Sequence, residues 1–130
     1  MADAKKIKVL AVDDSNFMLA VISSYLKDSH FELVATAKNG SEALEQYTQH
    51  KPDVVLLDIV MPGETGVETL DRLLGTDSRA CVVMVSSLGT EDVVLDCLKK
   101  GAKSFLQKPF EKDALLAQLE KMCQEAGIGS

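Results

Sequence analysis

The sequence has no long apolar run and no extended apolar segment behind its charged opening, MADAKKIKVL. A membrane helix needs about 18 consecutive apolar residues, and no stretch approaches that length. We therefore expect a soluble, cytoplasmic protein that does not associate with membranes.

Cysteine and histidine are also scarce. The three cysteines, Cys81, Cys97 and Cys123, are odd in number, widely separated and placed in apolar periodic stretches, not in Cys-x-x-Cys spacing. This pattern favours buried thiols in a reducing compartment over a disulfide framework or a metal site. His30 and His50 are isolated near the ends of helical patterns, which argues against a metal-ligating or general-base role.

Basic residues are outnumbered. The 130 residues include 14 lysines and arginines against 20 aspartates and glutamates, for a formal net charge of -6. Such a chain repels nucleic-acid phosphates and anionic lipid, so we expect no nucleic-acid partner. The length suits one domain with a substantial core.

Short apolar runs alternate with amphipathic segments along the chain. The runs predict strands at 8–12, 32–37, 54–57, 81–85 and 104–107. The amphipathic segments predict helices at 15–28, 41–50, 65–74, 90–100 and 111–126. The signals are clearest in the fourth helix, where Thr90 can cap, acidic residues follow, and Lys99, Lys100 and Gly101 suit the end.

This alternation predicts an α/β fold with a doubly wound, five-stranded parallel sheet covered by helices on both faces. The first, third and fourth strands are almost wholly apolar, as central parallel strands should be. The second and fifth carry polar residues suited to edges. The expected strand order is therefore 2-1-3-4-5.

Polar side chains follow four of the predicted strands, at the end of the sheet where such folds place their sites. They are Asp13 and Asp14, Asp58, Ser86 and Ser87, and Lys108. Singly, each could cap a helix, start a turn or be solvated. Jointly, three neighbouring carboxylates repel one another unless a cation or a proton relieves them. An all-oxygen set of this kind suits Mg²⁺, with Mn²⁺ as an alternative, and a lysine beside it suits a phosphoryl oxygen.

Four motifs on this fold resemble one family. They are VDDS (12–15), LDIVMPGETG (57–66), VSS (85–87) and KPF (108–110). In this order they resemble the receiver domain of two-component response regulators, and the compact chain is similar to the CheY-like single-domain type, with its flavodoxin-like (βα)5 fold. The resemblance covers about residues 7–125, which we expect to be the core of a single receiver domain formed by residues 1–130.

The resemblance implies a role for each matching residue. Asp58 would be the phosphoacceptor. Asp14, Asp58 and the backbone carbonyl of Val60 would hold Mg²⁺, while Asp13 would orient metal-bound water or bind nearby. Because a strand end is rigid, a carboxylate there can be aimed at an incoming phosphorus atom.

Three further residues take roles from the resemblance. Ser86 and Lys108 would contact oxygens of the phosphoryl group. Phe105 stands at the position of the switch aromatic, and since it has no hydroxyl its switching must work by burial alone. The Lys108–Pro109 bond would be cis, a state that the proline makes accessible.

Two loop features are specific to this sequence. One affects the shape of a loop, and the other affects the lifetime of a phosphoryl group. PGETG places Gly63 and Thr65 where many relatives have a longer side chain and an aspartate, which affects loop shape and partner choice. The resemblance implies that Val60 and Leu88 border the approach of water to the phosphorus. Both are apolar, so neither could hold a water molecule by its side chain. We therefore expect a long-lived phosphoryl group.

The function implied is a signalling switch. A histidine kinase would supply the phosphoryl group, and the domain would change its affinity for a downstream protein, with chemotaxis as the suggested pathway. The contact face would be formed by the helix at 90–100, the strand at 104–107 and the helix at 111–126. The protein would not be an enzyme, although it would assist its own phosphorylation and dephosphorylation. A monomer is expected, and a phosphorylation-dependent dimer is left open.

Three alternatives stay open at this point. The chain could be the receiver domain of a larger regulator or hybrid kinase. A phosphohydrolase with an aspartyl nucleophile is disfavoured because such enzymes carry Asp-x-Asp on the first strand, whereas Asp13 and Asp14 are adjacent. A flavodoxin-like cofactor binder would need a phosphate loop rich in serine, threonine or glycine, and VDDSNF offers two negative charges instead.

Overall fold

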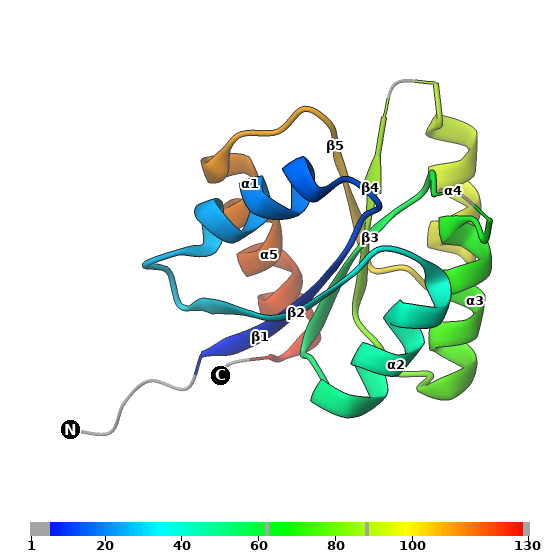
Figure 1. The fold of residues 1–130 in the computed structure, drawn as a ribbon, viewed down its shortest axis with the longest axis horizontal. Helices are drawn as coiled ribbons and strands as arrows, with labels where there is room; N and C mark the ends of the chain where they lie inside the picture. Colours follow the sequence, from blue (N-terminus) through cyan, green and yellow to red (C-terminus); the bar gives the residue numbers. More distant parts are fainter. Residues whose placement is uncertain (1–5, 62, 88, 129–130) are drawn as a thin grey trace.

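The computed structural model describes residues 6–61, 63–87 and 89–128. Five strands alternate with five helices (Figure 1). Their bounds are β1 (Ile7–Val12), α1 (Asn16–Leu26), β2 (Phe31–Ala37), α2 (Gly40–His50), β3 (Val54–Asp58), α3 (Gly66–Thr76), β4 (Val82–Ser86), α4 (Glu91–Lys100), β5 (Ser104–Gln107) and α5 (Lys112–Ala126). All ten predicted segments are confirmed, with small shifts at their ends.

The strands form one parallel sheet in the order β2-β1-β3-β4-β5, as predicted. Every residue of β3 and β4 is buried, and so is nearly all of β1. The edge strands β2 and β5 leave several side chains partly or fully exposed. Polarity along each strand therefore did indicate its place in the sheet, because only central strands are covered on both faces.

Helices cover both faces of the sheet (Figure 1). α1 and α5 lie on one side, where Leu19 and Leu115 pack with Val9 and Ala11 of β1. α2, α3 and α4 lie on the other side, over the alternate β1 residues such as Leu10. Since successive side chains of a strand point to opposite faces, one apolar strand contributes to two separate cores.

Two local expectations about helix ends need correction. α1 ends at Leu26 and not at residue 28, because the chain turns there and Asp28 adopts a φ of 62°. Thr90 does occupy the position before α4, but its side chain makes no capping bond. Its hydroxyl instead donates to the carbonyl oxygen of Ser87 at 2.6 Å.

All three cysteines are free thiols. Cys97 and Cys123 are buried as expected, whereas Cys81 is only half-buried. Burial raises the pKa of the Cys123 thiol to about 11, so it is protonated at neutral pH. None of the helices in the described ranges combines the length and the apolar character that a membrane crossing requires.

Candidate functional site

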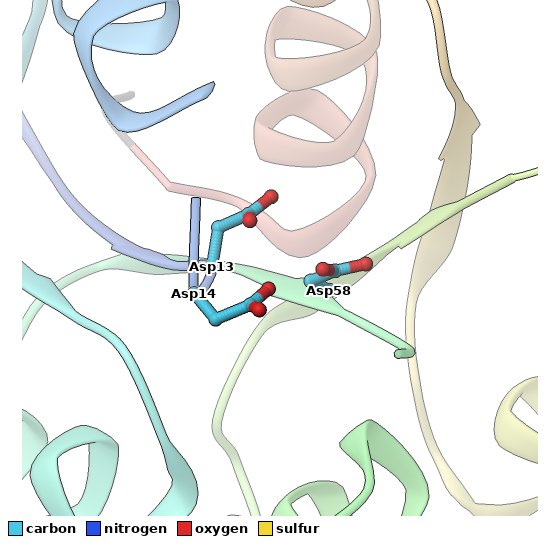
Figure 2. A group of neighbouring side chains, drawn as sticks. All are labelled: Asp13, Asp14 and Asp58. Atoms are coloured by element: carbon cyan, nitrogen blue, oxygen red, sulfur yellow. The ribbon is translucent and has the colours of Figure 1, made fainter. Parts of the chain in front are cut away.

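Three carboxylates meet at the carboxyl end of the sheet (Figure 2). Asp13 and Asp14 directly follow β1, and Asp58 is the last residue of β3. Each contributes a carboxylate oxygen, and these three atoms lie within 4.8 Å of one another. Asp13 and Asp58 are buried, whereas Asp14 is exposed. The acidic cluster expected from the sequence is therefore present, open to solvent on the Asp14 side.

The turn from β1 into α1 fixes Asp13. Its backbone N–H donates to the carbonyl oxygen of Ala37 at 2.9 Å, and its Oδ1 accepts from the backbone N–H of Ser15 at 2.9 Å. Ser15 in turn caps α1, because its Oγ accepts from the N–H of Met18 at 3.2 Å. Ser15 thus both caps α1 and holds the carboxylate of Asp13.

Lys108 directly follows the edge strand β5, and its side chain reaches the same carboxylates. Its Nζ lies 2.8 Å from Oδ2 of Asp13 and 3.5 Å from Oδ2 of Asp58. Its backbone N–H donates to the carbonyl oxygen of Ser86 at 2.6 Å, which prolongs the pairing of β4 and β5. The Lys108–Pro109 bond is cis, as predicted.

The surroundings of Asp58 disfavour its ionised form. Burial, and then the charge of Asp13, raise the pKa of the Asp58 carboxyl to about 6, although Lys108 and the backbone N–H of Val60 act in the opposite direction. The pKa of Lys108 is also raised, because the hydrogen bond to Asp13 and the nearby carboxylate charges outweigh its burial. The negative charge is therefore only partly balanced by one ammonium group.

This donor set fits a hard divalent cation. Three carboxylates converge with oxygen atoms close enough to share one ion, and one of them faces solvent. A dication would relieve the repulsion that raises the pKa of Asp58. All-oxygen coordination that leaves room for water is what Mg²⁺ prefers.

The loop from β3 to α3 lies beside the cluster. An added Cβ at Gly66 would stand 2.3 Å from the carbonyl oxygen of Asp58 and 2.6 Å from Cα of Ile59. The N–H of Gly66 donates to the carbonyl oxygen of Ile59 at 2.8 Å. Glycine therefore allows α3 to begin directly against the end of β3. Val60, inside this loop, has 59% of its surface exposed.

A cavity separates the two predicted switch residues. Ser86 is buried at the end of β4, and Phe105 on β5 is 45% exposed. The cavity, of about 220 Å³, is lined by Ser86, Ser87, Glu91, Val94, Leu95, Leu98, Phe105 and Gln107. Leu88, the second apolar residue expected to border the phosphorus, lies outside the described residues.

Sequence reasoning missed a polar cluster beside the β3 to α3 loop. Oε2 of Glu64 accepts a hydrogen bond from Oγ1 of Thr69 at 2.6 Å, and Oε1 pairs with Arg72. Thr69 is completely buried, among the apolar residues of α3. A threonine on the buried stripe of an amphipathic helix was the available signal, because a buried hydroxyl needs a partner.

Comparisons with known proteins agree with this geometry. The model of the response regulator receiver domain matches residues 9–120. The chain is 48% identical over 115 residues to the chemotaxis protein CheY of Listeria monocytogenes, covering 88% of this chain and 97% of that protein. It is 47% identical over 106 residues to a protein-glutamate methylesterase/protein-glutamine glutaminase of Bacillus licheniformis, covering 79% of this chain but only 29% of that protein.

A solved structure extends the likeness to three dimensions. The crystal structure of the CheX-CheY-BeF3-Mg²⁺ complex from Borrelia burgdorferi matches with a TM-score of 0.84 and 38% identity, covering 88% of this chain and 87% of that chain. These matches span nearly the whole sheet and favour neither a phosphohydrolase nor a flavodoxin-like cofactor binder. Sequence, fold and strand-end chemistry thus agree that the chain belongs to the response regulator receiver family and is CheY-like.

Proposed function

We propose that Asp58 accepts a phosphoryl group from a histidine kinase and that the added charge changes the affinity of the chain for a downstream protein. As a CheY-like receiver, the chain is a phosphorylation-activated signalling switch. The observation that carries the assignment to Asp58 is the convergence of Asp13, Asp14, Asp58 and Lys108 from three strands.

In the transfer, a carboxylate oxygen of Asp58 attacks the phosphorus of a phosphohistidine. A new O–P bond forms, the P–N bond breaks, and the imidazole leaves with the electron pair of that bond. The rigid end of β3 aims the carboxylate, and Lys108 moves from Asp13 to an oxygen of the transferred group. Ser86, at the end of the neighbouring strand, contacts another oxygen.

Asp14, Asp58 and the backbone carbonyl of Val60 would hold Mg²⁺, with Mn²⁺ as a substitute, and Asp13 would orient metal-bound water. The bound cation would neutralise charge on the phosphoryl oxygens. Asp58 itself must be ionised to attack. Its pKa of about 6 leaves it mostly ionised at neutral pH even without the cation.

The cavity beside Phe105 supports a route from Asp58 to a partner. Ser86 would move toward the phosphoryl group, and Phe105 would turn from solvent into the cavity that both residues line. This burial would change the face formed by α4, β5 and α5, where Leu95 is also exposed. Phosphorylation would thus shift a pre-existing equilibrium between two conformations.

The pathway and the assembly are part of the same proposal. The CheY relatives are named chemotaxis proteins, and the Borrelia burgdorferi complex pairs CheY with CheX, which supports a chemotaxis partner for this chain. We propose that residues 1–130 work as one receiver domain with a core of about residues 7–125. The domain would be a monomer before phosphorylation and would assist both the gain and the loss of its phosphoryl group.

Incubation with Mg²⁺ and a small phosphodonor tests the acceptor. Intact-mass measurement should detect one labile phosphoryl group, and excess chelator should prevent its addition. Asp58→Asn should not be labelled, whereas Asp71→Asn, a surface carboxylate on α3, should be labelled like the wild type. Undiminished labelling of Asp58→Asn would refute the assignment.

The switch is tested by amide chemical shifts with and without a phosphoryl mimic such as beryllofluoride. Shifts should extend from Asp58 to α4, Phe105 and the start of α5. Phe105→Leu keeps an apolar side chain at this position and should retain a smaller response. A response confined to the loops after β1 and β3 would contradict the switch.

A further inference from the structure

The loop between Asp58 and α3 ends in an acidic side chain that the phosphoryl transfer proposed above does not use. Glu64 turns inward from this loop, and each of its carboxylate oxygens has a partner on α3. Oε2 accepts from the hydroxyl of Thr69 at 2.6 Å, and Oε1 pairs with the guanidinium of Arg72. The carboxylate therefore ties the end of the loop to the first two turns of the following helix.

Glu64 also packs against the start of α2. A Cβ added at Gly40 would lie 1.8 Å from Oε2 of Glu64 and 2.6 Å from Oγ1 of Thr69. Asn39 fixes that helix start, because its Oδ1 accepts from the backbone N–H of Glu42 at 2.8 Å. The carboxylate thus occupies a fitted space where α2, α3 and the loop meet.

Thr69 gives Glu64 the shorter of the two hydrogen bonds available to its hydroxyl. Thr69 is completely buried, and its hydroxyl also lies 3.1 Å from the carbonyl oxygen of Thr65. Burial of the Glu64 carboxyl would by itself raise its pKa, but the hydrogen bond from Thr69 and the charge of Arg72 outweigh this and lower it. Glu64 therefore remains ionised at neutral pH, and its bond to Thr69 is charge-assisted.

Within the described part of this loop, Met61 is buried in the core, whereas its neighbour Val60 is exposed. The backbone N–H of Val60 makes a long contact of 3.4 Å with Oδ1 of Asp58. Gly63 adopts a φ of 81°. The base of the loop is closed by the bond from Gly66 to Ile59, so the geometry of Val60 depends on how both ends are anchored.

We infer that Glu64 is a positioning residue, which holds the loop from β3 to α3 so that the carbonyl of Val60 and the carboxylate of Asp58 keep the arrangement that a divalent cation needs. This inference rests on the proposed function, because it assumes that Val60 and Asp58 share a cation. It assigns to the Glu64 and Thr69 pair a part in cation affinity, in addition to its contribution to the stability of α3.

Titration of the metal-free protein with Mg²⁺, followed by calorimetry or amide shifts, tests the inference. Glu64→Ala and Thr69→Val should each weaken Mg²⁺ binding by about three- to tenfold, a smaller effect than loss of a partner bonded directly to a ligand. Their double variant should bind no more weakly than the weaker single variant, because both changes remove the same hydrogen bond. Glu64→Gln keeps an acceptor for Thr69 and should recover most of the affinity.

Two controls separate positioning from general loss of structure. Tyr47→Phe removes a bond of 3.0 Å from α2 to Asp77 after α3, at the opposite ends of the same two helices, and should leave Mg²⁺ affinity unchanged. Lys100→Met removes an exposed ion pair with Asp71 of α3, away from Glu64, and should have little effect. Labelling of Asp58 in Glu64→Ala should be slow at low Mg²⁺ and recover at saturating Mg²⁺.

The outcomes are distinct. If Glu64→Ala and Thr69→Val bind Mg²⁺ as the wild type does while their free energy of unfolding falls, Glu64 is only a structural residue and the inference is wrong. If Glu64→Ala does not fold, the Mg²⁺ affinity of Thr69→Val decides in the same way. If the wild type itself binds no Mg²⁺, the proposed function fails, and the inference fails with it.

Discussion

Asparagine in place of Asp58 should make the metal-free protein more stable at neutral pH. Asp58 is 5% exposed and lies beside the buried carboxylate of Asp13. Burial and that neighbouring charge disfavour its ionised form, and asparagine has nearly the same shape without the charge. In the absence of a cation, Asp58 therefore lowers the stability of the fold, as functional residues often do.

The magnitude follows from the pKa of the carboxyl. Asp58 has a pKa of about 6 in the folded chain against an ordinary value of 3.8, a difference of about 2 units. At 1.36 kcal/mol per unit, ionisation costs the folded state about 3 kcal/mol. Because the folded pKa is the higher one, this cost of ionisation is absent below about pH 4. Wild-type stability falls as the pH rises from there through about 6, where Asp58 ionises in the folded chain.

Urea unfolding in a chelator, followed by far-ultraviolet circular dichroism because the chain has no tryptophan, measures the effect. Asp58→Asn should gain up to about 3 kcal/mol over the wild type at pH 8 and lose that advantage near pH 4, with an unchanged denaturant slope. Asp14→Asn, an exposed carboxylate in the same cluster, should gain less.

Mg²⁺ provides an independent check. A tenfold excess over the dissociation constant should stabilise the wild type by about 1.4 kcal/mol, and Asp58→Asn by less, because one ligand is missing. If Asp58→Asn is as stable as the wild type or less stable at pH 8 in chelator, the argument from buried, repelling carboxylates is wrong.

Two further changes test the loops around Asp58. Val60→Asn combined with Leu88→Glu should shorten the half-life of the aspartyl phosphate at saturating Mg²⁺, because polar side chains can then hold the attacking water; an unchanged rate of phosphate release would show that the apolar pair does not set the lifetime. Gly66→Ala should cost about 1 to 3 kcal/mol of stability in urea unfolding, since its Cβ would stand 2.3 Å from the carbonyl oxygen of Asp58. Gly75→Ala in the same helix, where the added Cβ meets nothing within 4 Å, should instead be neutral or stabilising, and equal losses at both positions would contradict the steric argument.

Much of the fold could be predicted because its signals are local. Five apolar runs and five amphipathic segments were enough to place the elements, and the polar residues of β2 and β5 indicated the edges. The errors occurred at helix ends. Thr90 precedes α4 as expected, but nothing in the sequence told whether its hydroxyl would accept from the helix or donate to Ser87.

The candidate site was predictable for a different reason. Parallel strands end at one edge, so residues that follow separate strands must meet there, as Asp13, Asp14 and Asp58 do. The roles of Ser86, Phe105 and Lys108 come from the resemblance to receiver domains and stay predictions. The same holds for the lifetime gate formed by Val60 and Leu88.

The sequence by itself determined the order of the strands and which carboxylates gather, because both follow from periodicity and connectivity. Only the tertiary structure decided how those groups act on one another. Lys108 pairs with Asp13 across 95 residues, and the pKa of Asp58 depends on burial and on a neighbour from another strand. Glu64 finds Thr69 and the bare backbone of Gly40 only after two helices have packed. Distances between side chains and the exclusion of water exist only in the folded chain. They set how strongly the charged groups interact and how far their pKa values shift.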